Sequence, residues 1–323
     1  MKNSAPQISR DELALRLGDA NPPLVIDVLP EEYYKAAHLP GAKNACVFNV
    51  SFLDEVKRLV SDRSKPLVLY GSSSRDFASV TAAGRLRAAG YTQVTEYRGG
   101  LEGWRTAGQP IEGNPSTAKS SVSPGNGIHR INTEKSRIEW AGRNLASEHT
   151  GTIKLQAGQL EVQEGRPVRG AFTLDMDSID NLDIADSKLR EILICHLKSD
   201  DFFDVQRFPR AEFQLSKFKA LPDTQRGNPN WEVTGELTLK AVTGEITFPT
   251  ILALTPEGLF AADAHFDIDR TRWNVLYGSG KFYEKLGKHL VHDQISLALK
   301  LLTLPLVSDS ACVGRPSGKT GEA

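Results

Sequence analysis

The sequence predicts two domains of different fold class: a small α/β domain with a parallel sheet in residues 1–112, and an all-β antiparallel barrel in residues 128–304. Two patterns predict this division. In the first domain, short apolar runs alternate with helical stretches, as they do in βα units. From about residue 131 to residue 302, apolar side chains instead occupy every second position of short runs separated by turn residues. This second pattern is typical of strands with one buried face.

Neither of two further segments has such a pattern. Residues 113–127 are rich in Pro, Gly, Ser and Asn and are predicted to form a flexible linker. Residues 305–323 have a similar composition and are predicted to form a disordered tail. The first domain is therefore expected to be tethered to the second.

The first domain is expected to open on a helix, because Ser9 and Glu12 form a capping box ahead of two leucines at helical spacing. A longer helix is predicted over residues 77–89, and Gly90 ends it, since a left-handed C-cap favours glycine. The expected strands lie at 24–28, at 67–70 and around Val94. Strand and helix in alternation predict a parallel sheet.

The run 231–240 shows the strand pattern of the second domain most clearly, because its apolar side chains share one parity while polar side chains hold the other. About eight or nine such strands are present. A barrel of this size either fills with its own side chains or holds one small ligand, and both outcomes stay open. The apolar positions are Ile138, Trp140, Ile153, Leu155, Leu160, Val162, Phe172, Leu174, Met176, Phe213, Leu215, Trp231, Val233, Leu237, Leu239, Ile246, Phe248, Phe260, Ala262, Ala264, Phe266, Ile268, Ile295, Leu297, Leu299 and Leu301.

One helical segment interrupts the strands, with Asp183 and Asp186 at its start and Lys198 at its end. We expect its apolar stripe to be buried against a mouth or edge of the barrel, where Phe202 and Phe203 reach the same apolar region. The stripe consists of Leu189, Ile192, Leu193 and Leu197.

Three stretches of the second domain resemble the YceI family, in the right order and over residues 128–304. They are 196–213 (HLKSDDFFDVQRFPRAEF), 233–249 (VTGELTLKAVTGEITFP) and 266–273 (FDIDRTRW). The resemblance implies a lipocalin-like barrel that binds polyisoprenoid chains. In that family binding depends on the shape of the cavity, so no single side chain is marked as the ligand's partner.

The first domain resembles the rhodanese family over residues 5–112. The resemblance rests on the order and spacing of 26–28 (IDV), 32–33 (EY), 38–42 (HLPGA), 67–70 (LVLY) and 97–104 (YRGGLEGW). It implies a catalytic cysteine directly after the strand, at the head of an anion-cradling loop. This chain has instead a degenerate loop of Gly71, Ser72, Ser73, Ser74, Arg75 and Asp76.

The missing cysteine decides the enzyme question, because sulfur transfer through a persulfide requires a thiolate, and serine is a poor nucleophile without an activating base. Cys46 lies in a different loop and is interpreted as a small buried residue. The family's arginine at the far end of the loop is displaced, with Arg75 one position early and Asp76 in its place. We therefore predict no enzymatic activity and no catalytic residue.

Two interpretations of the three serines in this loop stay open. Backbone N–H groups before a helix attract anions, so the loop would still bind one. Alternatively, the serines cap the following helix, and we favour this interpretation.

Cysteine usage and charge limit the compartment and the partners. Cys46, Cys195 and Cys312 form no disulfide framework, and no apolar stretch is long enough for a signal peptide or a membrane span. We expect a cytoplasmic protein. A formal net charge of −1 with interspersed signs gives no support for a nucleic-acid partner.

The connection 277–292 is longer and more basic than a hairpin needs. Its Gly278–Lys281 segment lacks the first glycine and the Ser or Thr of a phosphate loop. His289 and His292 lack further ligands for zinc, so no metal or cofactor is predicted. Its lysines and aromatic residues either touch an anionic membrane surface transiently or, as we expect, pack on the barrel.

Small residues predict space inside the barrel, because Ala262 and Ala264 lie between two phenylalanines on the inward parity and Gly235 interrupts the run 231–239. A barrel packed solid is the alternative, since small residues also accommodate a taper. The predicted ligand-binding residues are Phe172, Leu174, Leu189, Ile192, Leu193, Phe203, Phe213, Leu237, Leu239, Ile246, Phe248, Ala262, Ala264 and Phe266.

The predicted function is non-enzymatic binding or carriage of a polyisoprenoid or another long apolar ligand. The rhodanese-like domain would then recognise a protein partner or regulate the barrel. The alternative is an interaction or stress-response scaffold with a packed barrel, and a lesser alternative is a sulfurtransferase.

Overall fold

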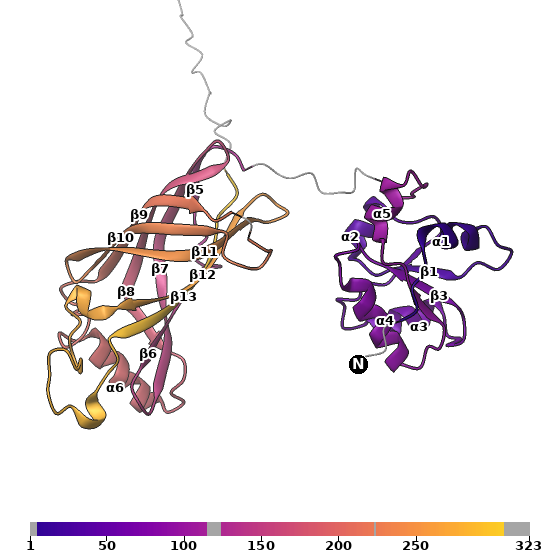
Figure 1. Cartoon of the computed structure of the whole chain (residues 1–323). Helices are drawn as coiled ribbons and strands as arrows, with labels where there is room; N and C mark the ends of the chain where they lie inside the picture. Colours follow the sequence, from indigo (N-terminus) through magenta and orange to yellow (C-terminus); the bar gives the residue numbers. More distant parts are fainter. Residues whose placement is uncertain (1–4, 115–123, 223, 307–323) are drawn as a thin grey trace, which may run out of the picture. The chain divides into compact units, whose positions relative to one another are not determined.

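The computed structural model describes residues 5–114, 124–222 and 224–306. The chain divides into two compact units, residues 1–121 and residues 122–323 (Figure 1). Most of the predicted linker and nearly all of the predicted tail, Cys312 included, lie outside the described residues. The boundaries of the linker and tail stay predictions.

The N-terminal unit is a four-stranded parallel sheet in the order β2-β1-β3-β4 with helices on both faces. The predicted parallel α/β domain is therefore confirmed, and β2 is a short strand that the sequence did not reveal. The strands are β1 (Leu24–Asp27), β2 (Lys43–Asn44), β3 (Leu67–Tyr70) and β4 (Val94–Glu96), and the helices are α1 (Arg10–Leu17), α2 (Glu31–Ala36), α3 (Phe52–Leu59), α4 (Ala78–Ala88) and α5 (Gly100–Thr106).

Alternate residues of β3 enter two different cores, because successive side chains of a strand point to opposite faces. Leu67 and Leu69 pack with side chains of α3 and α4, whereas Val68 and Tyr70 pack with Leu13 of α1 and with α5. The sheet is thus buried on both sides, as is usual for parallel sheets. The serine cap of α1 is present, since Ser9 Oγ accepts a hydrogen bond from Glu12 N at 3.2 Å.

The C-terminal unit is a closed antiparallel barrel. Eight strands follow the order β7-β6-β13-β12-β11-β10-β9-β8, and β8 pairs with β7 to close the ring, while β5 pairs with the second half of β7. The predicted antiparallel barrel is confirmed. Its strands are β5 (Gly127–Arg130), β6 (Arg137–Arg143), β7 (Glu148–Gln163), β8 (Arg166–Asn181), β9 (Arg210–Ala220), β10 (Trp231–Leu239), β11 (Val242–Leu254), β12 (Phe260–Asp269) and β13 (Gln294–Leu302).

Helix α6 (Ser187–Lys198) lies between β8 and β9 at one end of the barrel (Figure 1). Its cap is Asp186, whose Oδ1 accepts hydrogen bonds from the backbone N–H of Lys188 and Leu189 at 2.9 and 3.0 Å. Leu197 is buried, and Leu193 packs against the barrel core. The helix therefore closes over the core with its C-terminal half.

The expectation that the whole stripe of α6 is buried is wrong, because Leu189 is 59% exposed and Ile192 is 64% exposed. At 3.6 residues per turn, side chains four apart drift by about 40°, so Leu189 is turned by about 80° from Leu197 around the helix axis. Ile192 is turned from Leu197 by about 140°. A contact centred on Leu193 and Leu197 therefore leaves both outside.

The connection between β12 and β13 is held by the buried Arg270. Arg270 lies in the 3-10 turn η2 (Arg270–Trp273), and its guanidinium donates hydrogen bonds to the backbone oxygens of Val275, Val291 and His292 at 2.5, 3.1 and 3.1 Å. Burial lowers the pKa of Arg270, against the opposing effect of Asp293 and Asp269. This side chain therefore ties both ends of the connection together.

Between these anchors, the connection contains one further 3-10 turn, η3 (Gly287–His289), and no α-helix. Phe282 and Tyr283 are exposed. Our expectation that these aromatic residues pack on the barrel is therefore wrong. The two ends of the connection contact the barrel interior instead, because Tyr277 packs against the core and Val291 lines the cavity.

No helix in the described part of the chain is long and apolar enough to span a bilayer.

Candidate functional site

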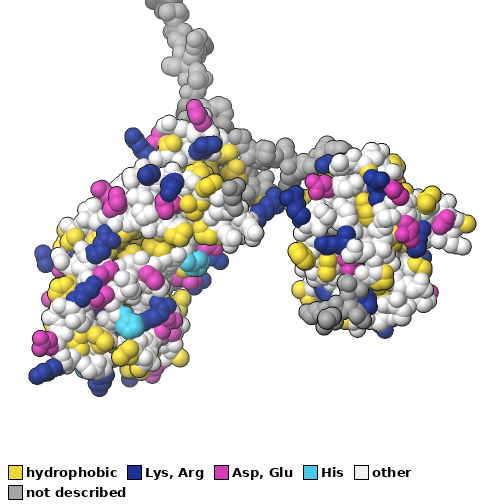
Figure 2. Space-filling view, viewed as in Figure 1, with side chains coloured by type: hydrophobic (Ala, Val, Ile, Leu, Met, Phe, Trp, Pro, Cys, Tyr) yellow, Lys and Arg dark blue, Asp and Glu magenta, His cyan; other side chains and the backbone are white. Residues whose placement is uncertain are grey.

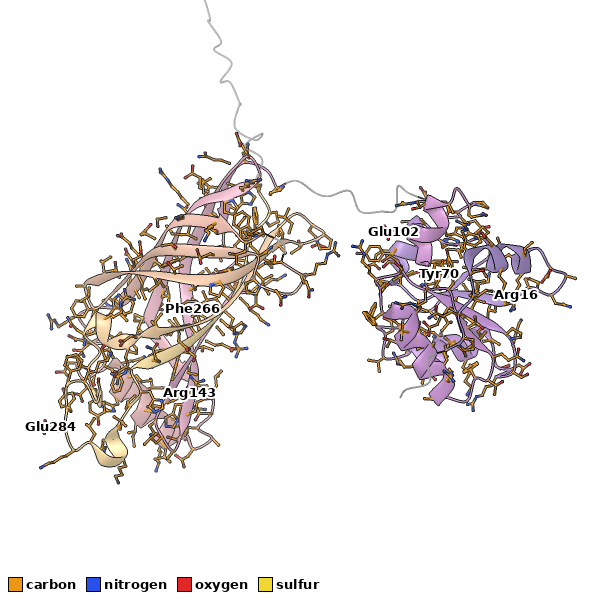
Figure 3. The ribbon with its side chains drawn as sticks, viewed as in Figure 1. Arg16, Tyr70, Glu102, Arg143, Phe266 and Glu284 are labelled. Carbon is orange, nitrogen blue, oxygen red and sulfur yellow. The ribbon has the colours of Figure 1, made fainter. Side chains whose placement is uncertain are left out.

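The barrel encloses a cavity of about 290 Å³. Inward-facing side chains of the eight ring strands line it, together with Leu193 and Leu197 of α6 and the two phenylalanines that follow the helix. Its wall is almost wholly apolar. Phe248 and Phe266 stack in this wall with ring centroids 4.0 Å apart, and Figure 3 labels Phe266 within the barrel unit.

Twelve of the fourteen predicted ligand-binding residues line this cavity, and their role in binding stays a prediction. The exceptions are Leu189 and Ile192, which point to solvent as described above. The twelve are Phe172, Leu174, Leu193, Phe203, Phe213, Leu237, Leu239, Ile246, Phe248, Ala262, Ala264 and Phe266.

The space that we expected above Gly235 is absent. A Cβ atom on Gly235 would lie 2.5 Å from the Phe213 ring and 2.6 Å from Gln214 O. The register between β9 and β10 also shifts between Thr234 and Gly235. This glycine therefore accommodates the close approach of an aromatic ring and leaves no room for a ligand, whereas Ala262 and Ala264 do line the cavity.

The cavity reaches the surface at the α6 end of the barrel. Asn144, Ser147 and His149 line the cavity and are themselves partly or fully exposed. At the other end the lining residues Ile131, Phe260 and Thr303 are buried. We therefore define the mouth as the opening beside the hairpin 143–149.

Hydrogen bonds fix the hairpin at the mouth. His149 Nδ1 lies 2.9 Å from Asp183 Oδ2, and Thr150 N donates to Asp183 Oδ1 at 2.7 Å. Slight burial opposes ionisation of Asp183, but these bonds and one from Asn181 outweigh it and lower the pKa of its carboxyl group. A stable carboxylate thus holds the end of β8 against the start of β7.

Sequence reasoning missed several polar lining residues. They are Arg143, Asn144, Ser147 and His149, which lie at the end of β6, in the hairpin loop and at the start of β7. At such positions the alternation of a strand does not predict which way a side chain points. Arg270 belongs to the stretch 266–273 that resembles the YceI family, but the sequence predicted no role for it. The apolar lining residues Trp140, Met176 and Phe260 share the inward parity and were available to the same argument.

The loop 71–76 of the N-terminal unit is filled by its own side chain. Asp76 Oδ2 accepts hydrogen bonds from Ser72 N at 2.8 Å and Ser72 Oγ at 2.9 Å, and Oδ1 accepts one from Ala78 N at 2.8 Å. Partial burial opposes ionisation, but these bonds and Arg98 outweigh it and lower the pKa of Asp76. The carboxylate therefore occupies backbone N–H groups that an external anion would need.

The interpretation that the serines cap the next helix is wrong. Helix α4 begins at Ala78, its N-cap residue Phe77 makes no side-chain cap bond, and the carboxylate of Asp76 takes the first free N–H instead. A tight turn at 73–76 separates the serines from the helix. They therefore lie too early in the chain to act as caps.

Residue 71 has little room for a side chain. A Cβ atom on Gly71 would lie 2.5 Å from Asp76 Oδ2. The opposite wall is the start of α5, where Leu101 N donates to Gly71 O at 3.0 Å and Glu102 N donates to Ser72 O at 2.9 Å. Any side chain at position 71 must therefore displace the Asp76 carboxylate.

The described residues of the two units form no metal-binding cluster. In residues 5–114, 124–222 and 224–306, no three His, Cys, Asp or Glu side chains are placed as a metal site requires. Of the described cysteines, Cys46 is buried, as we interpreted it, and Cys195 is exposed on α6.

Individual known proteins resemble each half of the chain. A curated relative, the HTH-type transcriptional regulator Rv0324 of Mycobacterium tuberculosis, is 35% identical over 109 residues, which are 33% of this chain and 46% of the relative. The chain thus spans about half the length of that relative. The solved rhodanese-like domain of the Alr3790 protein from Anabaena sp. is 28% identical, with a TM-score of 0.31, and the match covers 37% of this chain and 86% of that domain.

Two further solved structures resemble the barrel unit. BcnA of Burkholderia cenocepacia is 22% identical with a TM-score of 0.43, covering 53% of this chain and 98% of BcnA. A polyisoprenoid binding domain from Saccharophagus degradans is 11% identical with a TM-score of 0.41, covering 54% of this chain and 97% of that domain.

Two family models match the chain. The rhodanese-like domain matches residues 9–107, and the YceI-like domain matches residues 129–302, which is more than half of the chain. Both ranges agree with the resemblances in the sequence and with the two folds. The chain belongs to the YceI-like family and carries a rhodanese-like domain ahead of the family's barrel.

Proposed function

We propose that the barrel binds and carries a polyisoprenoid or another long apolar molecule and catalyses no reaction. The apolar cavity of about 290 Å³ is the observation that supports this most directly. Protein cores contain few voids larger than a water molecule, and a single water needs only about 10–15 Å³ by the same measure. A barrel that acted only as a packed scaffold would have no use for such a void.

The chemistry of the wall favours a long hydrocarbon chain. Each buried methylene contributes about 0.8 kcal/mol, so several isoprene units bind without a strong polar anchor. Membership of the YceI-like family supports the same ligand class, because the family binds polyisoprenoids. Nothing in the wall favours a nucleic acid or a small polar substrate.

The N-terminal unit acts in this proposal as a catalytically silent recognition or regulatory module. Gly71 supplies no nucleophile, and the Asp76 carboxylate occupies the N–H groups of the loop. Phe77, which directly follows the loop, is exposed, as are Phe48 and Val50 of the same unit, and these apolar side chains support a protein partner. We place the protein in the cytoplasm, where its cysteines stay reduced.

Native mass spectrometry of the purified full chain, followed by organic extraction, tests the proposal. We expect a mass excess that disappears on denaturation and an extract that contains an isoprenoid or a similarly apolar molecule. The proposal fails if no apolar molecule is recovered from several expression hosts and added polyprenol does not bind. The scaffold alternative would then be favoured.

A further inference from the structure

Exposed apolar side chains gather at the end of the barrel that carries the cavity mouth. They belong to the hairpin 143–149, to the start of α6 with the residues before it, and to the connection 277–292. Figure 2 shows apolar side chains interspersed with Lys and Arg on the surface of this unit. The exposed residues are Leu145, Leu182, Leu189, Ile192, Phe282 and Tyr283. We call them the apolar rim.

The three segments that carry the apolar rim are joined to one another. Leu182 N donates a hydrogen bond to Thr150 O at 2.8 Å, which joins the end of β8 to the hairpin. The connection joins the hairpin through His292 N and Arg143 O at 2.8 Å. It also contacts α6, because the rings of His196 and Tyr277 lie 4.6 Å apart. Figure 3 labels Arg143 and Glu284 on this end of the barrel.

The contrast with the opposite end is strong. The other exposed large apolar side chains of the described barrel unit are Ile128, Leu304 and Leu306. Leu304 pairs there with Arg130 next to β5, where the cavity is closed by buried side chains. Apolar exposure thus concentrates where the cavity opens, as it would if both served one ligand.

Charges around the rim suit a phospholipid surface. Lys188, Lys285 and Lys288 are exposed and have no ion-pair partner among the described residues. Of the nearby acids, Asp183 and Asp186 accept hydrogen bonds from backbone N–H groups, whereas Glu191 and Glu284 are exposed. The segments 143–149, 180–198 and 277–292 contain seven Lys and Arg and six Asp and Glu, so an anionic bilayer would not repel them.

From this juxtaposition we infer that the apolar rim docks on the surface of a phospholipid bilayer. Leu145, Leu189 and Ile192 would enter the boundary between head groups and acyl chains, and the lysines would contact phosphates. The cavity mouth would then face the acyl chains, and an isoprenoid would pass between membrane and barrel without crossing water. The inference rests on the proposed function only for the identity of the passing molecule.

Vesicle flotation of the full chain tests this docking. The probe is vesicles of phosphatidylcholine with about 30% phosphatidylglycerol, a content at which anionic head groups attract basic side chains. We expect the protein to float with the vesicles and the double variant Leu189→Ser, Ile192→Ser to lose at least about tenfold in bound fraction. The matched control Ile128→Ser, Leu304→Ser removes two exposed apolar side chains from the opposite end and should float like the wild type.

A fluorophore on Cys195 gives a second readout. Cys195 is exposed on α6, Cys46 is buried, and Cys312→Ser removes the remaining thiol. We expect its emission to shift to the blue on addition of vesicles. Both rim substitutions replace exposed residues, so thermal unfolding should show that the variant is folded.

Polyprenol binding in vesicle-free detergent solution separates this inference from the proposed function. A rim variant that binds polyprenol but no longer floats supports docking. A wild type that floats but binds no isoprenoid supports docking and contradicts the proposed function. Docking is overturned if the wild type does not float, if the rim variant floats equally well, or if the rim substitutions abolish only self-association in gel filtration.

Discussion

The two units differ in whether the place where a ligand could bind is empty or is filled by the protein's own side chains. In the barrel, side chains from eight strands meet without filling the centre, and a cavity of about 290 Å³ remains. In the loop 71–76, the protein fills the site itself, because the Asp76 carboxylate accepts hydrogen bonds from Ser72 and Ala78. The proposed site for an apolar chain therefore consists of space that the barrel wall does not fill, whereas the N–H groups that could bind an anion in the loop already bind the protein's own carboxylate.

The difference follows from the interactions involved. Apolar contact is not directional and adds up over a large area, so no single residue of the barrel marks the site. Hydrogen bonds to an anion need a few aligned donors, so one internal acceptor satisfies them. Four predictions test this comparison, beginning with the largest expected effect.

Truncating a leucine should lower the free energy of unfolding more in the N-terminal unit, whose core is packed, than at the cavity of the barrel. Leu86 of α4 is fully buried in the N-terminal core, so Leu86→Ala should lower the free energy of unfolding by about 2–5 kcal/mol. Leu193 of α6 lines the cavity, and Leu193→Ala should cost about 1 kcal/mol, because little new void is created. Thermal and urea unfolding of the full chain measure both changes. Equal costs would show that the barrel behaves as a rigid core at this helix.

Filling the cavity should weaken ligand binding while leaving the barrel folded. Ala264 of β12 is buried and lines the cavity, and Ala264→Phe adds a phenyl ring that should displace about three methylenes of the ligand, each contributing about 0.8 kcal/mol. Binding of polyprenol should weaken by about 2 kcal/mol, or roughly 30-fold in Kd. The control is Ala261→Phe on the same strand, which lies outside the cavity lining. If both variants bind like the wild type, the ligand does not occupy this cavity.

Sulfur transfer by the loop 71–76 should require removal of the Asp76 carboxylate that fills it. We expect no thiosulfate:cyanide sulfurtransferase activity in the wild type, and weak activity in Gly71→Cys, because the new side chain collides with Asp76 Oδ2. Gly71→Cys with Asp76→Arg should exceed the single variant at least about tenfold, which corresponds to about 1.4 kcal/mol of activation free energy. Persulfide formation and turnover report the effect. Wild-type turnover that survives Cys46→Ser would contradict the silent loop.

The smallest expected effect concerns Asp27, which is fully buried at the end of β1. Burial raises the pKa of its carboxyl group above the ordinary value of 3.8, although a hydrogen bond from Leu29 N opposes the rise. The folded protein therefore binds more protons than the unfolded chain above pH 3.8, and the stability of this unit falls as pH rises through that window.

Asp27→Asn removes this titration and can still accept a hydrogen bond from Leu29 N. We expect its stability at pH 7 to equal or slightly exceed that of the wild type, because the neutral amide carries no charge that burial penalises. Urea unfolding at several pH values between 4 and 7 measures the change, with the exposed Asp54→Asn as control. A wild-type stability that rises with pH while Asp27→Asn stays unchanged would contradict the raised pKa.

Sequence reasoning predicted the strands well because alternation is local. The alternating run 231–240 became β10 (Trp231–Leu239), and the helix before β9 began at its predicted acidic cap Asp186. Directions that depend on packing were predicted less well. Leu189 shares i,i+4 spacing with Leu193 yet is exposed, and the gap at Gly235 is filled by Phe213 from the neighbouring strand.

By itself the sequence determined the two fold classes, the family resemblances, the missing cysteine at position 71 and the inward parity of the barrel strands. Each of these depends on residue identity or on spacing within one short segment. Only the tertiary structure decided that the barrel is hollow, that Asp76 enters its own loop, and that apolar side chains surround the mouth. Those features arise where side chains that are distant in sequence come into contact. How much space such side chains leave, and which hydrogen bonds they form, depends on the folded arrangement and not on any short segment.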